Sequence, residues 1–209
     1  FEAIKESRIP VYISDSGDNP TAGSSSDVTG FLKLLMNDPR TKHLSHPIIF
    51  GGIYDPHAVK ACEGKLGKDI TLTFGGKFDS VTSTPITAKG RVKAYIKEWP
   101  YSSLIRGDVA LFSSMGVDIV ISEAHIGYTS PKLFTDLGIN PKAAEIVVCK
   151  LGYLTPEHET IAKHKIMALT KGSTNEDLTT LNYKYLKRPI YPLDDNFVYH
   201  PEKCLFIKE

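Results

Sequence analysis

The sequence predicts an α/β protein, in which a mixed sheet flanked by helices carries an antiparallel β-rich insertion. Near both ends of the chain, short apolar runs alternate with helical segments, which is typical of β-loop-α units. Between about residues 69 and 122, long runs alternate apolar with polar residues, as antiparallel strands with one solvated face do. With 209 residues and 41% hydrophobic content, the chain can build one large domain with a real core. We therefore expect a single domain over residues 1–209.

Two β-loop-α units are expected in the first part of the chain. Val11 to Ile13 forms the first strand, and Leu32 to Met36 lies on the helix that follows its polar loop. Pro47 to Tyr54 has the composition of a buried strand. Asp55 can cap the helix that begins at Pro56, because proline suits the first helical turn.

The rest of the chain continues with strands and then returns to α/β alternation. Further strands are expected at residues 69–78, 86–99, 109–112, 117–122, 145–149 and 165–170, and helices at 131–137, 156–163 and 178–186. Two Xaa-Pro pairs then end regular structure. We expect an extended tail over about residues 187–209.

The composition excludes several classes of function. The net charge is +1, and the 25 basic and 24 acidic residues are spread along the chain, unlike the clustered basic surface of a nucleic-acid-binding protein. No apolar run approaches the roughly 18 to 20 residues of a membrane-spanning helix, and no signal segment is recognisable. Cys62, Cys149 and Cys204 are far apart, so we expect reduced thiols. The sequence thus favours a cytoplasmic protein and leaves homo-oligomerisation open.

The polar loop after the first strand is the leading candidate for a binding site. It contains Asp15, Ser16, Asp18 and Asn19, and it is longer and more acidic than a strand-to-helix connection usually needs. Loops at the carboxyl ends of strands hold the ligands of many α/β proteins, and the free N–H groups of a helix N-terminus favour anions. A P-loop is excluded because no Gly-Lys-Ser/Thr follows.

Five further residues near the ends of strands or helices are candidates for helix caps or for contacts with a ligand. Ser26 and Asp27 are expected to cap the following helix with a side-chain oxygen, which needs no ligand. His125 follows a strand end, which favours a position in a cleft. Lys150 follows a buried strand, so its ammonium must point into a cleft or to water. Lys77 supports the same argument with less force.

No metal site or catalytic signature is predicted from local motifs. The pairs His43 with His46 and Asp55 with His57 have suggestive spacings, but a metal site needs three or more convergent ligands. We expect His158 to lie on a helix and to be solvated. The chain has neither a Gly-x-Ser-x-Gly elbow nor a His-Glu-x-x-His helix. The sequence therefore predicts no self-contained catalytic centre.

Several stretches form a recognisable set when they are taken together and in order. They are SDSGDNPTAGSSSDVT (Ser14 to Thr29), IYDPHAVKAC (Ile53 to Cys62), LTFGGKFD (Leu72 to Asp79), GINPKAAEIVVCK (Gly138 to Lys150) and KRPIYPLD (Lys187 to Asp194). The set resembles the C-terminal domain of the microcystinase C (MlrC-like) family, zinc peptidases associated with the degradation of linearised microcystin. The resemblance covers most of the chain, and the Asp-Asn-Pro loop is among its most specific parts.

The resemblance implies a division of labour between two domains. Zinc and the main catalytic groups would lie on an N-terminal domain of the same polypeptide, which would be the partner of this region. The fragment itself would hold no zinc and would not be active alone, and the substrate would be a peptide or a small amide. Asp15, Ser16, Asp18 and Asn19 would face the cleft between the domains, with Lys150 nearby.

Other functions stay open. Residues 150–154 read Lys-Leu-Gly-Tyr-Leu where the family commonly has Lys-Ser and a downstream His-Phe, so substrate specificity is not transferred. The region could instead be a non-catalytic module that binds a small anion or serves as an assembly surface. A third alternative is a complete small enzyme that uses Asp15, Asp18 and His125 directly. The chain begins at Phe1 rather than Met, which we interpret as a piece of a longer polypeptide.

Overall fold

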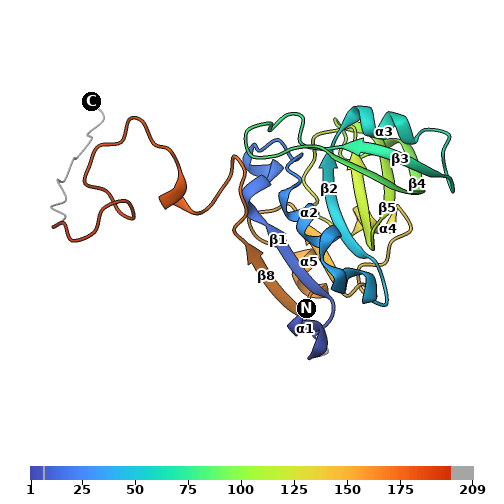
Figure 1. Ribbon diagram of the computed structural model, residues 1–209, viewed down its shortest axis with the longest axis horizontal. Helices are drawn as coiled ribbons and strands as arrows, with labels where there is room; N and C mark the ends of the chain where they lie inside the picture. Colours follow the sequence, from blue (N-terminus) through green and yellow to red (C-terminus); the bar gives the residue numbers. More distant parts are fainter. Residues whose placement is uncertain (7, 199–209) are drawn as a thin grey trace. The chain divides into compact units, whose positions relative to one another are not determined.

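The computed structural model describes residues 1–6 and 8–198 of the chain (Figure 1). Internal contacts divide the chain into a compact unit, Phe1–Glu176, and a second unit that begins at Asp177. The first unit holds the sheet and every α-helix found among these described residues. Part of the expected extended tail, residues 199–209, lies outside the described residues, and so does Cys204.

The first unit is built on one eight-stranded mixed sheet in the order β3-β4-β5-β6-β2-β7-β1-β8, which confirms the predicted α/β class. The strands are β1 (Val11–Asp15), β2 (Ile48–Tyr54), β3 (Asp69–Phe74), β4 (Ile86–Pro100), β5 (Arg106–Ser114), β6 (Val117–Ser122), β7 (Ile146–Cys149) and β8 (His164–Ala168). The helices are α1 (Glu2–Lys5), α2 (Gly30–Asn37), α3 (Pro56–Cys62), α4 (Lys132–Thr135) and α5 (Pro156–Ile161).

The two halves of the sheet differ in strand direction, as their sequences predict. Strands β3 to β6 form an antiparallel meander, while β6, β2, β7, β1 and β8 run parallel to one another. The antiparallel region over residues 69–122 therefore extends the parallel sheet and is not a separate layer, because β6 pairs directly with β2. Figure 1 shows β8 at the outer side of the parallel half.

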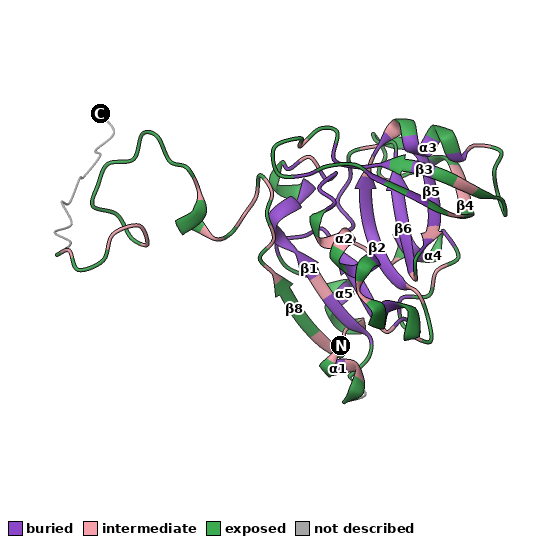
Figure 2. Cartoon of the chain, in the orientation of Figure 1, coloured by how far each residue is buried: buried purple, intermediate pink, exposed green. Residues whose placement is uncertain are grey.

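Helices cover both faces of the sheet because the central strands are apolar on both sides. Phe50 of β2 packs with Leu32 of α2 and Val59 of α3 in one core. Its neighbour Ile49 packs with Phe134 of α4 in the other core, since successive strand residues point to opposite faces. In Figure 2 the central strands are buried, whereas the edge strand β8 is largely exposed.

The second unit contains little regular structure among its described residues. A single 3-10 turn, Leu178–Thr180, stands where we expected a helix over residues 178–186, so that prediction was wrong. Asp177 caps this turn by accepting a hydrogen bond from the Thr179 N–H, a local interaction that does not require a helix to continue. Among the helices of the described residues, none has the length and apolar character needed to cross a membrane.

The sheet tolerates no side chain at Gly52 of β2. A Cβ atom there would overlap the ring and hydroxyl of Tyr128, which is buried on the α4 side of the sheet. We predict that Gly52→Ala lowers the free energy of unfolding by about 1 to 3 kcal/mol, the usual cost of overpacking. Gly30→Ala is the control, because a Cβ atom at that first residue of α2 meets no atom within 4 Å. Urea titration of both variants measures the difference, and equal stabilities would contradict the prediction.

Candidate functional site

The candidate site lies at the sheet edge where parallel strands end. β1, β2 and β7 are adjacent and point the same way, so their carboxyl ends meet at this edge. The polar loop 15–29 leaves β1 here, and Lys150 follows β7 directly. This is the edge at which α/β proteins place their ligands. The sequence-predicted residues are therefore brought together, although they are far apart along the chain.

Lys150 is fully buried beneath the polar loop and makes an ion pair there. Its ammonium donates to Asp18 Oδ2 at 2.5 Å and to the Val28 carbonyl oxygen at 2.7 Å, and Asp15 Oδ2 lies 3.8 Å away. Its side chain is 0% exposed and that of Asp18 is 1% exposed. Lys150 is therefore neither a free ammonium in a cleft nor an exposed lysine at a strand end. The ammonium charge is paired with the Asp18 carboxylate inside the protein and does not face a ligand cleft.

Asp18 also joins the first half of the polar loop to its second half. Its two carboxylate oxygens accept the N–H groups of Ser26 and Val28, each at 2.8 Å. Burial alone would raise the pKa of Asp18, but the Lys150 ammonium and these hydrogen bonds outweigh it and hold the pKa below its ordinary value. Backbone donors that a bound anion could have used are therefore satisfied by the chain's own carboxylate.

The first half of the loop is covered by the segment that follows β8. Asp15 accepts a hydrogen bond from the Thr170 hydroxyl, and burial raises its pKa even though Lys150 and Thr170 oppose that shift. Ser16 donates to the Ala168 carbonyl oxygen at 3.2 Å. A Cβ atom at Gly17 would overlap the Thr170 carbonyl oxygen, so the two segments are in direct backbone contact. Asp15 and Ser16 are thereby buried.

Asn19 organises the turn at the outer end of the loop. Its side-chain oxygen accepts the Thr21 N–H at 3.0 Å and the Thr21 hydroxyl at 2.7 Å, which caps the 3-10 turn Pro20–Ala22. Its own N–H donates to the Thr174 hydroxyl at 2.9 Å. Asn19 is 9% exposed, and Thr21, Ala22 and Gly23 beyond it are exposed.

Asp27 joins the polar loop to the loop after β3 and does not cap α2. The N-cap of α2 is Thr29, so the capping role predicted for Ser26 and Asp27 was wrong. The Asp27 carboxylate accepts the N–H groups of Lys77, Phe78 and Asp79 at 2.7, 2.7 and 3.1 Å. A helix cap and a cross-loop anchor use the same carboxylate oxygens, and in this structure the three N–H groups of the distant loop take them.

Asp55 performs two tasks at the end of β2. It caps α3 by accepting the Ala58 N–H at 3.0 Å, as predicted from the Asp-Pro pair. Its second oxygen accepts the Gly75 N–H at 3.0 Å and the Lys77 ammonium at 2.7 Å. The Lys77 side chain is 33% exposed, so its charge lies at the surface but is paired.

His125 is the exposed member of the predicted set. Its Nε2 lies 2.6 Å from the Ser24 carbonyl oxygen, which ties the loop after β6 to the polar loop. The imidazole stands edge-on to the ring of Tyr54, with the centroids 5.4 Å apart and the planes at 88°. Tyr54 in turn contacts the ring of Phe78 at 4.9 Å. Tyr54 and Phe78 were not predicted from the sequence as site residues. Tyr54 is the last residue of β2, and Phe78 comes shortly after the Gly75-Gly76 pair.

The described residues offer no metal centre of their own. Within residues 1–6 and 8–198, no three His, Cys, Asp or Glu side chains converge as metal ligands. His158, which we expected to be solvated, is buried against Tyr12 and Phe134 and lies 2.9 Å from the Tyr128 carbonyl oxygen. That expectation was wrong because its partners lie on elements that are distant in sequence. The residues present here therefore do not fit a metal ion.

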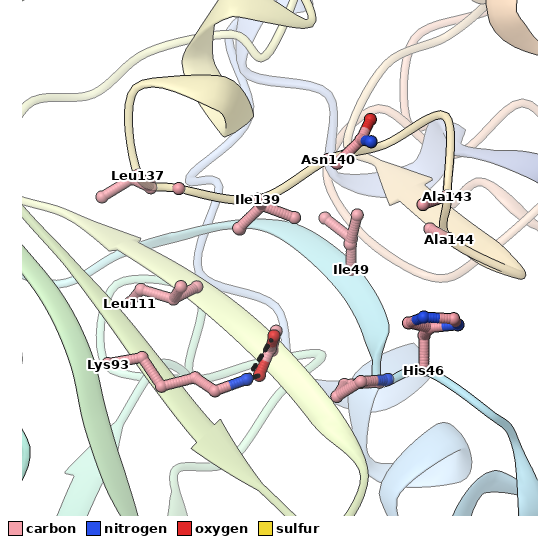
Figure 3. A pocket seen from close by; sticks show the side chains of 12 residues that line it. His46, Ile49, Lys93, Leu111, Leu137, Ile139, Asn140, Ala143 and Ala144 are labelled. Carbon is pink, nitrogen blue, oxygen red and sulfur yellow. Dashed lines mark hydrogen bonds and ion pairs between the residues drawn. The ribbon is translucent and has the colours of Figure 1, made fainter.

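A separate cavity of about 430 Å³ opens near the amino end of β2, away from the polar loop (Figure 3). Ile49, Leu111 and Ile139 give it apolar walls, and Figure 3 shows Lys93 and His46 at its margins. The Lys93 ammonium pairs with Asp118 at 2.9 Å. None of the residues predicted from the sequence to form the site lines this cavity.

The fold and its loops define the class of the first unit: an α/β domain whose loops at the carboxyl edge are fixed by internal aspartates. A family model described as "MlrC C-terminus" matches residues 13–185, so the chain belongs to that family. It is 30% identical over 146 residues to Microcystinase C of Sphingomonas sp., covering 68% of this chain and 28% of that protein.

A crystal structure named "Putative metallopeptidase" from Mesorhizobium sp. BNC1 has the same fold, with a TM-score of 0.71 at 19% identity. The alignment covers 92% of this chain and 40% of that one.

Breaking the buried ion pair should cost more than breaking a surface pair. We predict that Lys150→Met lowers the free energy of unfolding by about 3 to 5 kcal/mol, because it leaves the buried Asp18 carboxylate without a counter-ion. Lys165→Met, which breaks a surface pair with Glu159 whose two side chains are 52% and 48% exposed, should cost at most about 1 kcal/mol. Denaturant titration of both variants measures the contrast. Similar small losses would show that the burial of Lys150 carries no energetic weight.

The acid sensitivity of the fold should depend on Asp18. Its native pKa lies below the unfolded value, so its stabilising effect is present above pH 4 or so and is lost as the pH falls. We predict that the stability difference between wild type and Asp18→Asn is constant above about pH 5 and shrinks as the pH falls below about 4. Unfolding titrations at several pH values measure it. A difference that stays constant with pH would contradict the assigned direction.

Proposed function

We propose that this region is the C-terminal, substrate-cleft domain of a microcystinase C-like, zinc-dependent peptidase or amidohydrolase. The observation that carries the proposal is the convergence of the loops after β1, β2, β3, β6 and β7 at one sheet edge, where Asp18, Asp27 and Asp55 fix them. Such an edge can form one wall of a cleft. The family membership is consistent with this reading.

The metal and the main catalytic groups are proposed to lie elsewhere in the polypeptide. The residues described here do not fit a metal ion, and the aligned region makes up only 28% of Microcystinase C. An N-terminal domain would then supply the zinc and the groups that act on the amide. The present domain would supply shape, hydrogen bonds and exclusion of water around the substrate. Zinc as the metal, a cytoplasmic location and homo-oligomerisation stay predictions.

The residues first predicted to bind substrate receive different roles in this proposal. Asp15, Ser16, Asp18 and Lys150 are buried and bonded to one another or to covering segments, so they act as positioning residues. Asn19 shapes the exposed turn 21–23, and His125 stands at the surface. The small-anion module is supported less well, since Asp18 already occupies the loop's N–H groups.

The complete product of the gene that encodes this chain provides the test. We expect it to hydrolyse small peptides or amides and to lose that activity on removal of metal by a chelator. Asn19→Ala should lower kcat/KM about tenfold by loosening the turn, with little loss of folded protein. Thr135→Ala, on α4, is the control and should leave turnover unchanged, because this exposed side chain bonds only its own helix. Steady-state kinetics and the melting temperature of each variant are the measurements.

Two results would count against the proposal. Absence of hydrolysis across a broad panel of peptides and amides by metal-loaded protein would favour a binding or assembly module. Tightly bound metal and full activity in the isolated 209-residue chain would contradict the proposed division of labour. In that case the third reading, a complete small enzyme that uses Asp15, Asp18 and His125, would gain support.

A further inference from the structure

Three exposed or partly exposed rings form a cluster at the carboxyl edge, which we call the rim cluster: Tyr54, Phe78 and His125. Phe78 is 57% exposed, although a phenylalanine at the surface gains nothing for folding. Its backbone is nevertheless held in place, because the Phe78 N–H and both neighbouring N–H groups donate to the buried Asp27 carboxylate. An exposed aromatic side chain on an anchored loop is a preorganised contact group.

The hydrogen bond to Ser24 fixes the chemistry of the His125 ring. A carbonyl oxygen can only accept, so the Nε2 that lies 2.6 Å from it must carry the proton. In the neutral imidazole the other nitrogen, Nδ1, is then an acceptor. The hydrogen bond to Ser24 uses Nε2 and leaves Nδ1 unused, and His125 is exposed. The exposed side of this ring can therefore take a hydrogen bond from an N–H or O–H of a ligand.

The charged groups beside the rim cluster are bonded within the protein. Asp27 and Asp55 are buried, and each accepts several hydrogen bonds. The Lys77 ammonium, next to Phe78 in the chain, is paired with Asp55 at 2.7 Å. An anionic ligand therefore meets no unpaired lysine in the rim cluster. What the cluster exposes is ring surface and one acceptor nitrogen, which suit an apolar side chain beside an N–H donor.

We propose that the rim cluster binds a peptide segment of the substrate. An apolar or aromatic side chain of that segment packs on Phe78 and Tyr54, and the backbone N–H of the same residue donates to His125 Nδ1. The proposal rests on the proposed function and specifies its substrate class: peptides with an apolar residue, rather than small charged amides. His125 is then a substrate-binding residue whose orientation depends on Ser24 and Tyr54.

The test uses the complete gene product in a chelator, which prevents turnover, and three peptides of identical length. The peptides are acetyl-Ala-Phe-Ala amide, its analogue with an N-methyl group on Phe, and acetyl-Ala-Ala-Ala amide. N-methylation removes the proposed donor but also adds a methyl group, so the comparison with His125→Phe separates the two effects. We expect wild type to bind the N-methyl peptide about fivefold more weakly than its parent, as the loss of one hydrogen bond implies. His125→Phe should show no difference between the two.

Side-chain recognition is tested with the same peptides. Wild type should prefer the Phe peptide over the Ala peptide by about tenfold, and Phe78→Ala should remove most of that preference. Val81→Ala is the matched control, because Val81 is on the same loop and is 94% exposed but has no ring contact with the cluster. It should bind all three peptides as wild type does. Calorimetric titration gives the affinities, and thermal melting confirms that each variant is folded.

Three outcomes would overturn the inference. One is an equal penalty for N-methylation in wild type and His125→Phe, and another is absence of peptide binding by folded wild type. The third is a large fall in melting temperature for Phe78→Ala together with no peptide binding, which would mean that the rim cluster packs against another part of the polypeptide. Hydrolysis by the same protein with metal restored is measured separately, so failure of the rim cluster and failure of the proposed function are distinguishable.

Discussion

The burial of one ammonium group constrains the loops at the carboxyl edge of the parallel strands. Lys150 follows the fully buried strand β7, and its side chain has no exposed surface. A charge in that position needs a counter-ion and further acceptors, because the desolvation cost is several kcal/mol for an unpaired ion. Asp18 and the Val28 carbonyl oxygen supply them, and Asp15 stands close by. The polar loop must therefore fold back over the strand ends, whatever it later binds.

Other loops at this edge are fixed relative to that first one by further carboxylates. Asp27, within the loop that Asp18 closes, accepts three N–H groups from residues 77–79. Asp55, at the end of β2, holds Gly75 and the Lys77 ammonium. Carboxylates suit this task because each offers several acceptor positions and charge-assisted hydrogen bonds are the stronger ones. The acceptor positions of these carboxylates are therefore occupied within the protein and are not available to a ligand.

The fold could be predicted from the sequence more completely than the site. Periodicity identifies strands such as β2 and β4, since apolar and alternating patterns follow from burial of one or two faces. The gathering of the predicted polar residues at one edge also follows, because parallel strands end together. The contacts that each polar side chain makes cannot be predicted from these patterns. Asp27 and His158 were misjudged because their partners, residues 77–79 and Tyr128, are set by tertiary packing that no local pattern contains.

Internal bonding explains why the carboxylates of this edge are not the groups that it exposes. If Asp18, Asp27 and Asp55 were free, they would make the edge strongly acidic, and it would repel carboxylates of ligands. Asp18 and Asp55 are instead paired with lysines, and Asp27 is held by backbone N–H groups. Phe78 and His125 therefore present ring surface and a nitrogen acceptor close to three buried carboxylates. In the function proposed above the reacting amide is uncharged, and binding it would need hydrogen bonds and apolar contact more than net charge. On that proposal, the electrostatic part of the reaction would fall to groups beyond this domain.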